Sequence, residues 1–202
     1  FMDGIDGLAA SQALFMLLAS LALKLTVTDL DTTLLDAVTA PVPVASLVLA
    51  AAVAGFLLLN WPPARIFMGD AGSLFLGFAL FALAAHDVTY GDISLWSWLF
   101  LGGVFIVDAT ATLLRGFVTG QRVTAAHRSH FYQRLSRRWG RHGRVTLVYF
   151  LLNVAWLLPL AFLAHRAANW APVILAVAWL PMALVCWRGG AGTSVWGVVA
   201  VR

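Results

Sequence analysis

The sequence predicts an all-α, polytopic membrane protein, and two features of its 202 residues support that prediction. Apolar residues make up 61% of the chain and charged residues only 11%, whereas a soluble domain is usually about 45–50% apolar and about 25% charged. The apolar residues also gather into stretches close to the roughly 20 residues that a membrane-spanning helix needs. This pattern excludes a water-soluble globular enzyme, a disordered chain, a coiled coil and collagen.

Six spans are expected within a single membrane domain that covers residues 1–202. Lys24 lies near the end of the first span, where its side chain can extend to the membrane surface. Pro62 and Pro63 follow the second span, as proline does just outside helices. The predicted spans are residues 8–28, 44–61, 73–88, 95–114, 145–165 and 170–187.

The distribution of positive charge orients these spans. The loop over residues 115–144 carries eight arginines, and Arg65, Arg188 and Arg202 fall on the same side if the spans alternate. The loops on the other side contain five aspartates and only Arg166 as a basic residue. Since cytoplasmic loops are enriched in Lys and Arg, we expect both termini to be cytoplasmic. Topology thus accounts for the basic excess, and we expect no nucleic-acid partner.

The first candidate motif is Phe-Met-Asp-Gly-Ile-Asp-Gly-Leu at residues 1–8. On a helical turn, Asp3 and Asp6 would present their carboxylates in one direction. The alternative is that the two aspartates only complement the dipole of the following helix. Because the chain opens inside this motif, we expect it to be the later part of a longer protein, with upstream helices missing.

The second motif is Phe-Met-Gly-Asp-Ala-Gly-Ser at residues 67–73. Ser73 is a natural N-cap, and the free N–H groups after it could bind an anion. Asp70 between two glycines fits a ligand of Mg²⁺, which prefers one or two carboxylates together with substrate phosphates and water. The alternative is an ordinary capped helix start.

The third motif is Ala-His-Arg-Ser-His-Phe-Tyr-Gln-Arg-Leu at residues 126–135. His127 and His130 are one turn apart with Arg128 between them, which suits contacts to a diphosphate or to sugar oxygens. The alternative is positive-inside charge followed by a helix in the headgroup region. His142 is interpreted as a basic-loop residue without a role in the site.

Asp108 is the one acidic residue expected well inside a span, in the inner half of the bilayer. Ionisable residues at such depth are functional candidates by default. A structural contact with Arg115 or a threonine is an equally good interpretation, so we predict only a supporting role for Asp108.

Together the three motifs resemble the polyprenyl-phosphate N-acetylhexosamine-1-phosphate transferases. This membrane family of glycosyltransferase family 4 includes phospho-MurNAc-pentapeptide transferase and UDP-GlcNAc:undecaprenyl-phosphate GlcNAc-1-phosphate transferase. The resemblance runs from Phe1 to about Leu163, and the third motif looks most like the branch that starts bacterial O-antigen synthesis.

The resemblance implies transfer of an N-acetylhexosamine-1-phosphate from a UDP-sugar to polyprenyl (undecaprenyl) phosphate with release of UMP. It implies a role in lipopolysaccharide or cell-envelope synthesis, a multi-pass protein of the bacterial inner membrane, and an active site on the cytoplasmic face. Asp70 matches the family's Mg²⁺ ligand, with Mn²⁺ as an alternative metal, and Asp3 and Asp6 match acidic residues of the active cleft. The remaining matches are His127, Arg128 and His130, in the loop that contacts the nucleotide-sugar. A homodimer is a further expectation.

The chain departs from the family pattern in one respect. An Asp-Asp pair on a preceding loop, and Asn residues before the first motif, are absent from these residues. We therefore assign no base for the lipid phosphate and expect the 202 residues alone to be inactive. Two other classes stay open: a cation transporter or channel with Asp3, Asp6 and Asp108 along its path, and a catalytically inactive scaffold.

Overall fold

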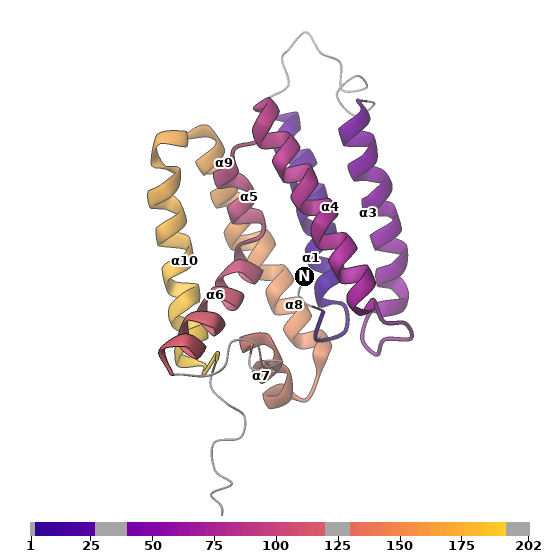
Figure 1. The fold of residues 1–202 in the computed structure, drawn as a ribbon, viewed down its shortest axis with the longest axis vertical. Coiled ribbons are helices and arrows are strands. Elements are labelled where there is room, and N and C mark those ends of the chain that lie inside the picture. The colour runs from indigo at the N-terminus through magenta and orange to yellow at the C-terminus, as the bar shows by residue number, and fades with distance from the viewer. Residues whose placement is uncertain (1–2, 27–39, 120–129, 193–202) are drawn as a thin grey trace, which may run out of the picture.

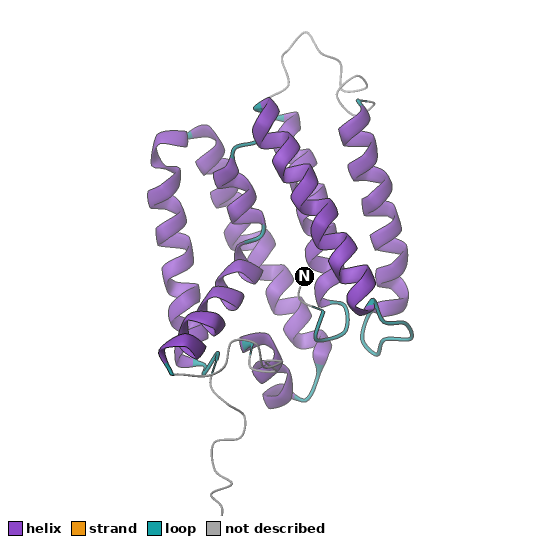
Figure 2. Cartoon of the chain, in the orientation of Figure 1, coloured by secondary structure: helices purple, strands orange, loops and turns teal. Residues whose placement is uncertain are grey.

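The computed structural model describes residues 3–26, 40–119 and 130–192, and their regular structure is entirely helical (Figure 2). Five helical segments are long and apolar enough to cross a membrane. A sixth crossing results if two shorter helices, bent by 78° at one break, are counted as one span. The predicted all-α polytopic bundle of about six spans is therefore confirmed.

The long helices run alternately up and down the bundle (Figure 1). Helix α7 and the α3–α4 connection lie at the lower end in this view, and the α4–α5 connection lies at the upper end. The helices are α1 (Leu8–Leu25), α3 (Pro41–Asn60), α4 (Gly69–Tyr90), α5 (Leu95–Leu101), α6 (Gly103–Val118), α7 (Phe131–Trp139), α8 (His142–Leu152), α9 (Leu158–Arg166) and α10 (Ala171–Arg188); a π-helical turn (Asn153–Leu157) joins α8 to α9, and a 3-10 turn (Ala168–Trp170) precedes α10.

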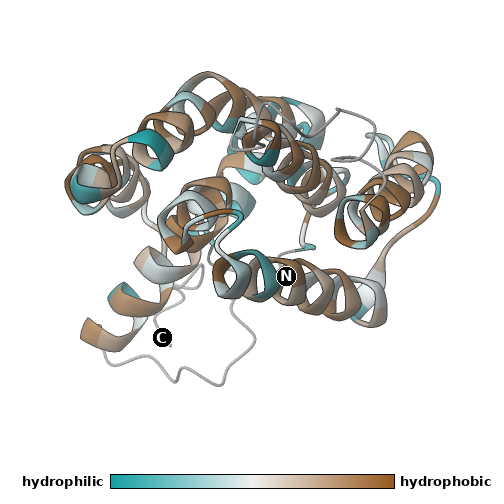
Figure 3. Cartoon of the chain, turned by 90° about the horizontal axis from the view of Figure 1, so that it is seen from above, coloured by the Kyte–Doolittle hydropathy of each residue, from teal (hydrophilic) through white to brown (hydrophobic). Residues whose placement is uncertain are grey.

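Helix α1 is the central helix of the bundle. Of its apolar window 67% is buried, whereas the other four unbroken spans are 17–28% buried. The exposed surface of the outer helices is strongly apolar, as in Phe75, Phe78 and Phe81 of α4, which are 63–70% exposed. The view from above shows this hydrophobic periphery (Figure 3). Such a surface fits a lipid environment.

The predicted fourth span, residues 95–114, corresponds to two helices, α5 and α6, that are bent by 78° at one break. Gly102 separates α5 from α6, and the bend leaves the Leu101 carbonyl needing a partner in an apolar interior. The buried Gln12 side chain of α1 donates to that carbonyl at 2.8 Å, and Asn153 donates to the Gln12 side-chain oxygen at 2.5 Å. Buried amide side chains from neighbouring segments thus supply hydrogen bonds at the break between α5 and α6.

Candidate active site

Asp3 and Asp6 lie in the turn that leads into α1. Helix α1 begins only at Leu8 and has no acidic residue in its first turn, so the prediction of a shared helical turn for the two aspartates is wrong. Gly7 precedes the helix with φ of +73°, a left-handed conformation that glycine adopts at little cost. The acidic residues therefore sit on an irregular loop whose shape depends on its neighbours.

The α3–α4 connection fixes this acidic loop. The buried Asn60 side chain accepts a hydrogen bond from the Gly7 N–H at 2.9 Å and donates to the Ile66 carbonyl at 2.9 Å. The Ala64 N–H donates to Asp6 Oδ2 at 3.3 Å. Two segments more than fifty residues apart in sequence are thus joined at the lower end of the bundle.

Asp70 lies in the first turn of α4 and is exposed. This helix begins at Gly69, whose φ is +64°, four residues before the predicted start. The prediction that Ser73 caps the helix is therefore wrong. The Ser73 side chain is buried, and its hydroxyl donates to the Asp70 carbonyl at 3.3 Å.

Electrostatics link the two acidic segments. Partial burial raises the pKa of Asp3 above its usual value of 3.8, and the negative charges of Asp6 and Asp70 raise it further. The Gly69 N–H acts in the opposite direction, because it donates to the Asp3 carboxylate and favours the charged form. Asp3 is thus repelled by both other carboxylates, and positive charge bound at this position would offset the repulsion.

A divalent cation would supply that charge, and the donor set fits Mg²⁺. Oxygen ligands are those that Mg²⁺ prefers, and it needs only one or two carboxylates, the remaining positions being taken by water and phosphate. Asp70 is the exposed member of the set, and Asp3 and Asp6 are partly exposed. Their oxygens do not all lie within 4.8 Å of one another, so a cation here would take one or two of these carboxylates, with water or a ligand in its other positions.

Helix α7 packs against the acidic loop through Tyr132. This side chain is 2% exposed, and a Cβ built on Gly4 would clash with its hydroxyl group, so the ring and the loop are in close contact. Burial raises the pKa of Tyr132, as do the charges of Asp108 and Asp3. Gly4 thus permits an approach that a larger residue would block.

Asp108 anchors the beginning of α7 from the neighbouring helix α6. Its fully buried carboxylate accepts the backbone N–H groups of Phe131 at 2.9 Å and Tyr132 at 3.1 Å. Further donors are the Tyr149 hydroxyl at 2.8 Å and the Thr112 hydroxyl at 3.3 Å. The threonine contact that the sequence left open is therefore present, whereas Arg115 donates to the Trp187 carbonyl and lies over the Trp187 ring.

Of the third motif, the structure describes His130 onwards. His130 immediately precedes α7, and its Nδ1 lies 3.5 Å from Asp108 Oδ1. His127 and Arg128 lie outside the described residues. The carboxylate that holds the start of α7 thus also contacts one histidine of the predicted nucleotide-sugar loop.

Three contacting residues were missed in the sequence analysis: Asn60, Tyr132 and His142. His142 Nδ1 lies 3.2 Å from Asp6 Oδ2. A signal was available for Asn60, an amide at the end of an apolar span and directly before Trp-Pro-Pro. Tyr132 stands inside the third motif but was not singled out there. His142 had no comparable local signal, because its partner Asp6 is 136 residues away in the chain.

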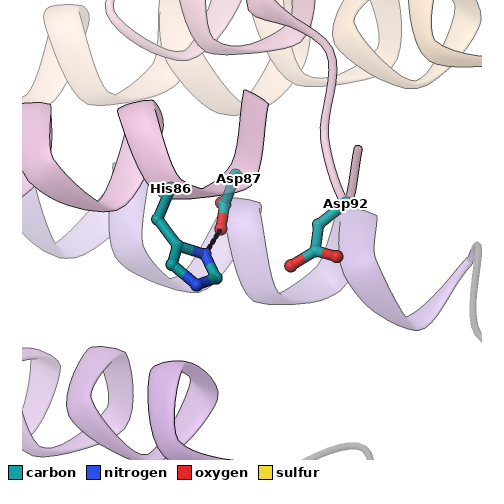
Figure 4. Close-up of side chains that lie close together, drawn as sticks. All are labelled: His86, Asp87 and Asp92. Carbon is teal, nitrogen blue, oxygen red and sulfur yellow. Dashed lines mark ion pairs between the residues drawn. The ribbon is translucent and has the colours of Figure 1, made fainter. Parts of the chain in front are cut away.

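A second cluster of titratable groups lies at the opposite end of the bundle (Figure 4). Within the described ranges, His86, Asp87 and Asp92 are the one trio of metal-ligating residues with ligand atoms within 4.8 Å of one another. Lys24 Nζ already occupies this position, 2.6 Å from Asp87 Oδ1 and 3.5 Å from Asp92 Oδ2. The group is therefore an ion-pair network between α1 and the end of α4.

Comparison with known proteins places the first two motifs in a sequence family. Residues 1–86 match the model of glycosyl transferase family 4, a segment that includes Asp3, Asp6 and Asp70. No solved structure was found to match the chain.

Curated relatives extend the similarity beyond the family segment. A Bacillus subtilis protein named "Probable undecaprenyl-phosphate N-acetylglucosaminyl 1-phosphate transferase" is 34% identical over 75% of the chain and 40% of its own length. A phospho-N-acetylmuramoyl-pentapeptide-transferase of Desulfitobacterium hafniense is 33% identical over 75% of the chain and 44% of its own length. The chain thus spans less than half the length of these relatives.

Proposed function

Because this chain belongs to glycosyl transferase family 4, we propose that it serves transfer of an N-acetylhexosamine-1-phosphate from a UDP-sugar to polyprenyl phosphate, with release of UMP. The observation that supports this most directly is the meeting of Asp3, Asp6 and Asp70 at one end of a membrane bundle. We further propose that this end is cytoplasmic, that the membrane is the bacterial inner membrane, and that the product enters lipopolysaccharide or other surface-glycan synthesis.

The proposed chemistry brings two anions together, the phosphate of the lipid acceptor and the diphosphate of the donor. Their repulsion must be offset by positive charge and hydrogen-bond donors fixed in advance. We propose that Asp70, with Asp3 or Asp6, holds Mg²⁺, for which Mn²⁺ could substitute. When bound, the metal would neutralise the diphosphate and orient it for attack.

The residues around the carboxylates have separate tasks in this proposal. The loop that contains His127, Arg128 and His130 contacts the nucleotide-sugar, and Asp108 supports it by holding the start of α7. Ser73 supports Asp70 from within α4 through its hydrogen bond to the Asp70 carbonyl. Since the negative charges of Asp6 and Asp70 raise the pKa of Asp3, we propose that Asp3 and Asp6 serve as cleft residues that balance the charge of the metal.

A transporter or channel is the competing class, and the environment of Asp108 argues against it. A residue on a cation path must offer a free oxygen to the ion. Both oxygens of Asp108 accept hydrogen bonds, and the side chain is fully buried. The ion pair at the other end of the bundle is likewise closed by Lys24.

Reconstitution of the intact protein tests the proposal. Purified protein in liposomes with undecaprenyl phosphate should release UMP from a UDP-N-acetylhexosamine when Mg²⁺ is added, and should not when the lipid or the metal is omitted. Comparison of UDP-sugars that differ at one hydroxyl would identify the donor. Cation flux that is independent of UDP-sugar, without UMP release, would instead establish a transporter.

A further inference from the structure

His142 occupies the first position of α8, beside the acidic loop. Helix α7 ends at Gly140 with φ of +65°, and Arg141 is extended, so the chain reverses direction before α8 begins. This tight connection returns the imidazole to the lower end of the bundle. None of the three sequence motifs contains this residue.

Two residues near the start of α8 contact Asp6. His142 Nδ1 lies 3.2 Å from Asp6 Oδ2, and one turn later the Thr146 hydroxyl donates to the Asp6 carbonyl at 2.9 Å. Residues four apart share one face of a helix, so a single helical face contacts both the side chain and the backbone of Asp6. The Asp6 N–H lies 3.5 Å from the same Nδ1. Because one imidazole nitrogen cannot accept there and donate to Oδ2 at once, we take the shorter 3.2 Å contact with the carboxylate as the hydrogen bond.

The contacts described for the Asp6 carboxylate converge on one of its two oxygens. Oδ2 accepts from the Ala64 N–H at 3.3 Å and faces His142 Nδ1. The side chain is 18% exposed, and its charge acts on the neighbouring Asp3. A carboxylate beside another negative charge would turn away without donors, whereas hydrogen-bond donors at one oxygen hold it in place.

We propose that His142 is a positioning residue of the phosphoryl-transfer site: its Nδ1–H donates to Asp6 Oδ2 and holds this carboxylate in a fixed orientation beside Asp3. The proposal rests on the proposed function. Donors that orient a carboxylate from outside a metal site commonly change metal affinity or activity by about 10–100-fold. The imidazole itself then contacts Asp6 and needs no contact with substrate.

Substitutions at His142 separate positioning from proton transfer. Asparagine can place an amide N–H near the position of Nδ1. Glutamine is less suitable, because its longer side chain reaches the position of Nε2. His142→Ala should lower kcat about tenfold or more with little change in the KM for UDP-sugar, and His142→Asn should recover most of that loss. Arg141→Ala is the matched control, because it removes the exposed neighbouring side chain and should leave kcat unchanged.

Two further variants distinguish positioning from general stability. Thr146→Ala removes a buried hydrogen bond to the Asp6 backbone without touching the carboxylate, so it should lower the melting temperature more than it lowers kcat. In an Asp6→Asn background, His142→Ala should produce no additional loss of turnover. An undiminished loss in that background, or an Asn variant no better than Ala, would overturn the proposal.

Mn²⁺ binding provides a readout that does not depend on turnover. Titration of the intact protein, followed by calorimetry or by the electron paramagnetic resonance of the free ion, should show weaker binding in His142→Ala than in wild type. His142→Asn should bind nearly as well as wild type. If wild type releases no UMP from any UDP-sugar, the proposed function fails, while unchanged Mn²⁺ affinity in His142→Ala would separately refute the role of His142.

Discussion

Asp70 differs from the other two site carboxylates in being exposed in the first turn of a helix. It therefore offers the most accessible oxygen ligands for a metal that must also reach substrate. Asp70→Asn keeps the size of the side chain and removes its charge. We expect the variant to fold and to lose turnover by about a hundredfold or more, a rise of roughly 2.7 kcal/mol in the activation barrier.

The measurement is UMP release over a range of Mg²⁺ concentrations. A variant whose affinity for Mg²⁺ has fallen should respond partly to higher concentrations. Turnover within about threefold of wild type, or less than roughly 0.7 kcal/mol of barrier, together with indifference to Mg²⁺, would show that Asp70 is not the metal ligand.

We expect the ionised Asp3 side chain to lower the stability of the metal-free protein while supporting turnover. Its pKa is raised in the folded protein by burial first and then by its acidic neighbours, so its ionised form destabilises the metal-free fold at neutral pH. We expect Asp3→Asn to raise the melting temperature in metal-free buffer at pH 7 and to lower turnover. As the pH falls through the raised pKa, wild-type Asp3 becomes neutral and the stability difference should shrink.

Thermal unfolding in detergent at several pH values, with and without Mg²⁺, tests this relation. Added Mg²⁺ should stabilise wild type more than the variant, because it offsets a repulsion that the variant lacks. A lower melting temperature for metal-free Asp3→Asn at pH 7 would contradict the assignment.

At this scale the sequence identified the charged residues of the site but not their partners. Asp3, Asp6 and Asp70 stand in glycine-rich motifs at the ends of apolar stretches, and charge in such positions needs an explanation even without a structure. Asn60 and His142 contact the acidic loop from 53 and 136 residues away in the chain. No local pattern encodes such pairing, because it depends on which ends of which helices meet.

Among the helices, α7 is the element whose position depends most visibly on one side chain. Two of its N-terminal N–H groups, which have no partners within the helix, are satisfied by Asp108 of α6. Asp108→Asn keeps the shape of the side chain but removes the charge and replaces one acceptor oxygen with a donor. We expect the start of α7 to loosen and the affinity for UDP-sugar to fall about tenfold, or roughly 1.4 kcal/mol.

Hydrogen exchange of the Phe131 and Tyr132 amides measures the loosening directly. Exchange in α10 of the same sample serves as the internal control and should stay unchanged. Faster exchange in both helices would indicate general destabilisation, and unaltered exchange at residues 131 and 132 would show that Asp108 does not hold α7.

The existence of each apolar helix was predictable, whereas the break between α5 and α6 was not. Residues 95–114 form one apolar stretch of ordinary span length, and Gly102-Gly103 within it only permits a bend. What stabilises the bend is Gln12 of α1, held in turn by Asn153. The predicted start of α4 was also misplaced: Ser73 looked like an N-cap, but the helix begins four residues earlier, at Gly69.

Across the whole molecule, charge is divided between the two ends of the bundle. At the end with the acidic loop, Asp3 is repelled by the negative charges of Asp6 and Asp70, while at the other end two acids pair with Lys24. Acids paired with a lysine suit a structural joint between helices, whereas carboxylates that crowd one another suit a surface that binds a cationic ligand. The two ends therefore differ in chemistry as well as in the basic residues of their loops.

This asymmetry leads to a prediction about membrane orientation. If the acidic loop faces the cytoplasm, the α4–α5 connection at the other end faces outward. A cysteine introduced by Asp92→Cys, or at residues 31–36, should react with a membrane-impermeant maleimide added outside intact cells. Arg65→Cys, in the α3–α4 connection, and a cysteine within residues 122–130 should react only after the membrane is opened.

The native protein supplies a useful background for this experiment. Its one cysteine, Cys186, is buried, and a Cys186→Ala variant without added cysteines gives the blank. Because the donor and metal are cytoplasmic in the proposed reaction, the proposed function requires the orientation that this experiment measures. If Arg65→Cys is labelled from outside while Asp92→Cys is protected, the three carboxylates face away from the cytoplasm and from its nucleotide-sugars. That result would contradict both the orientation and the proposed function.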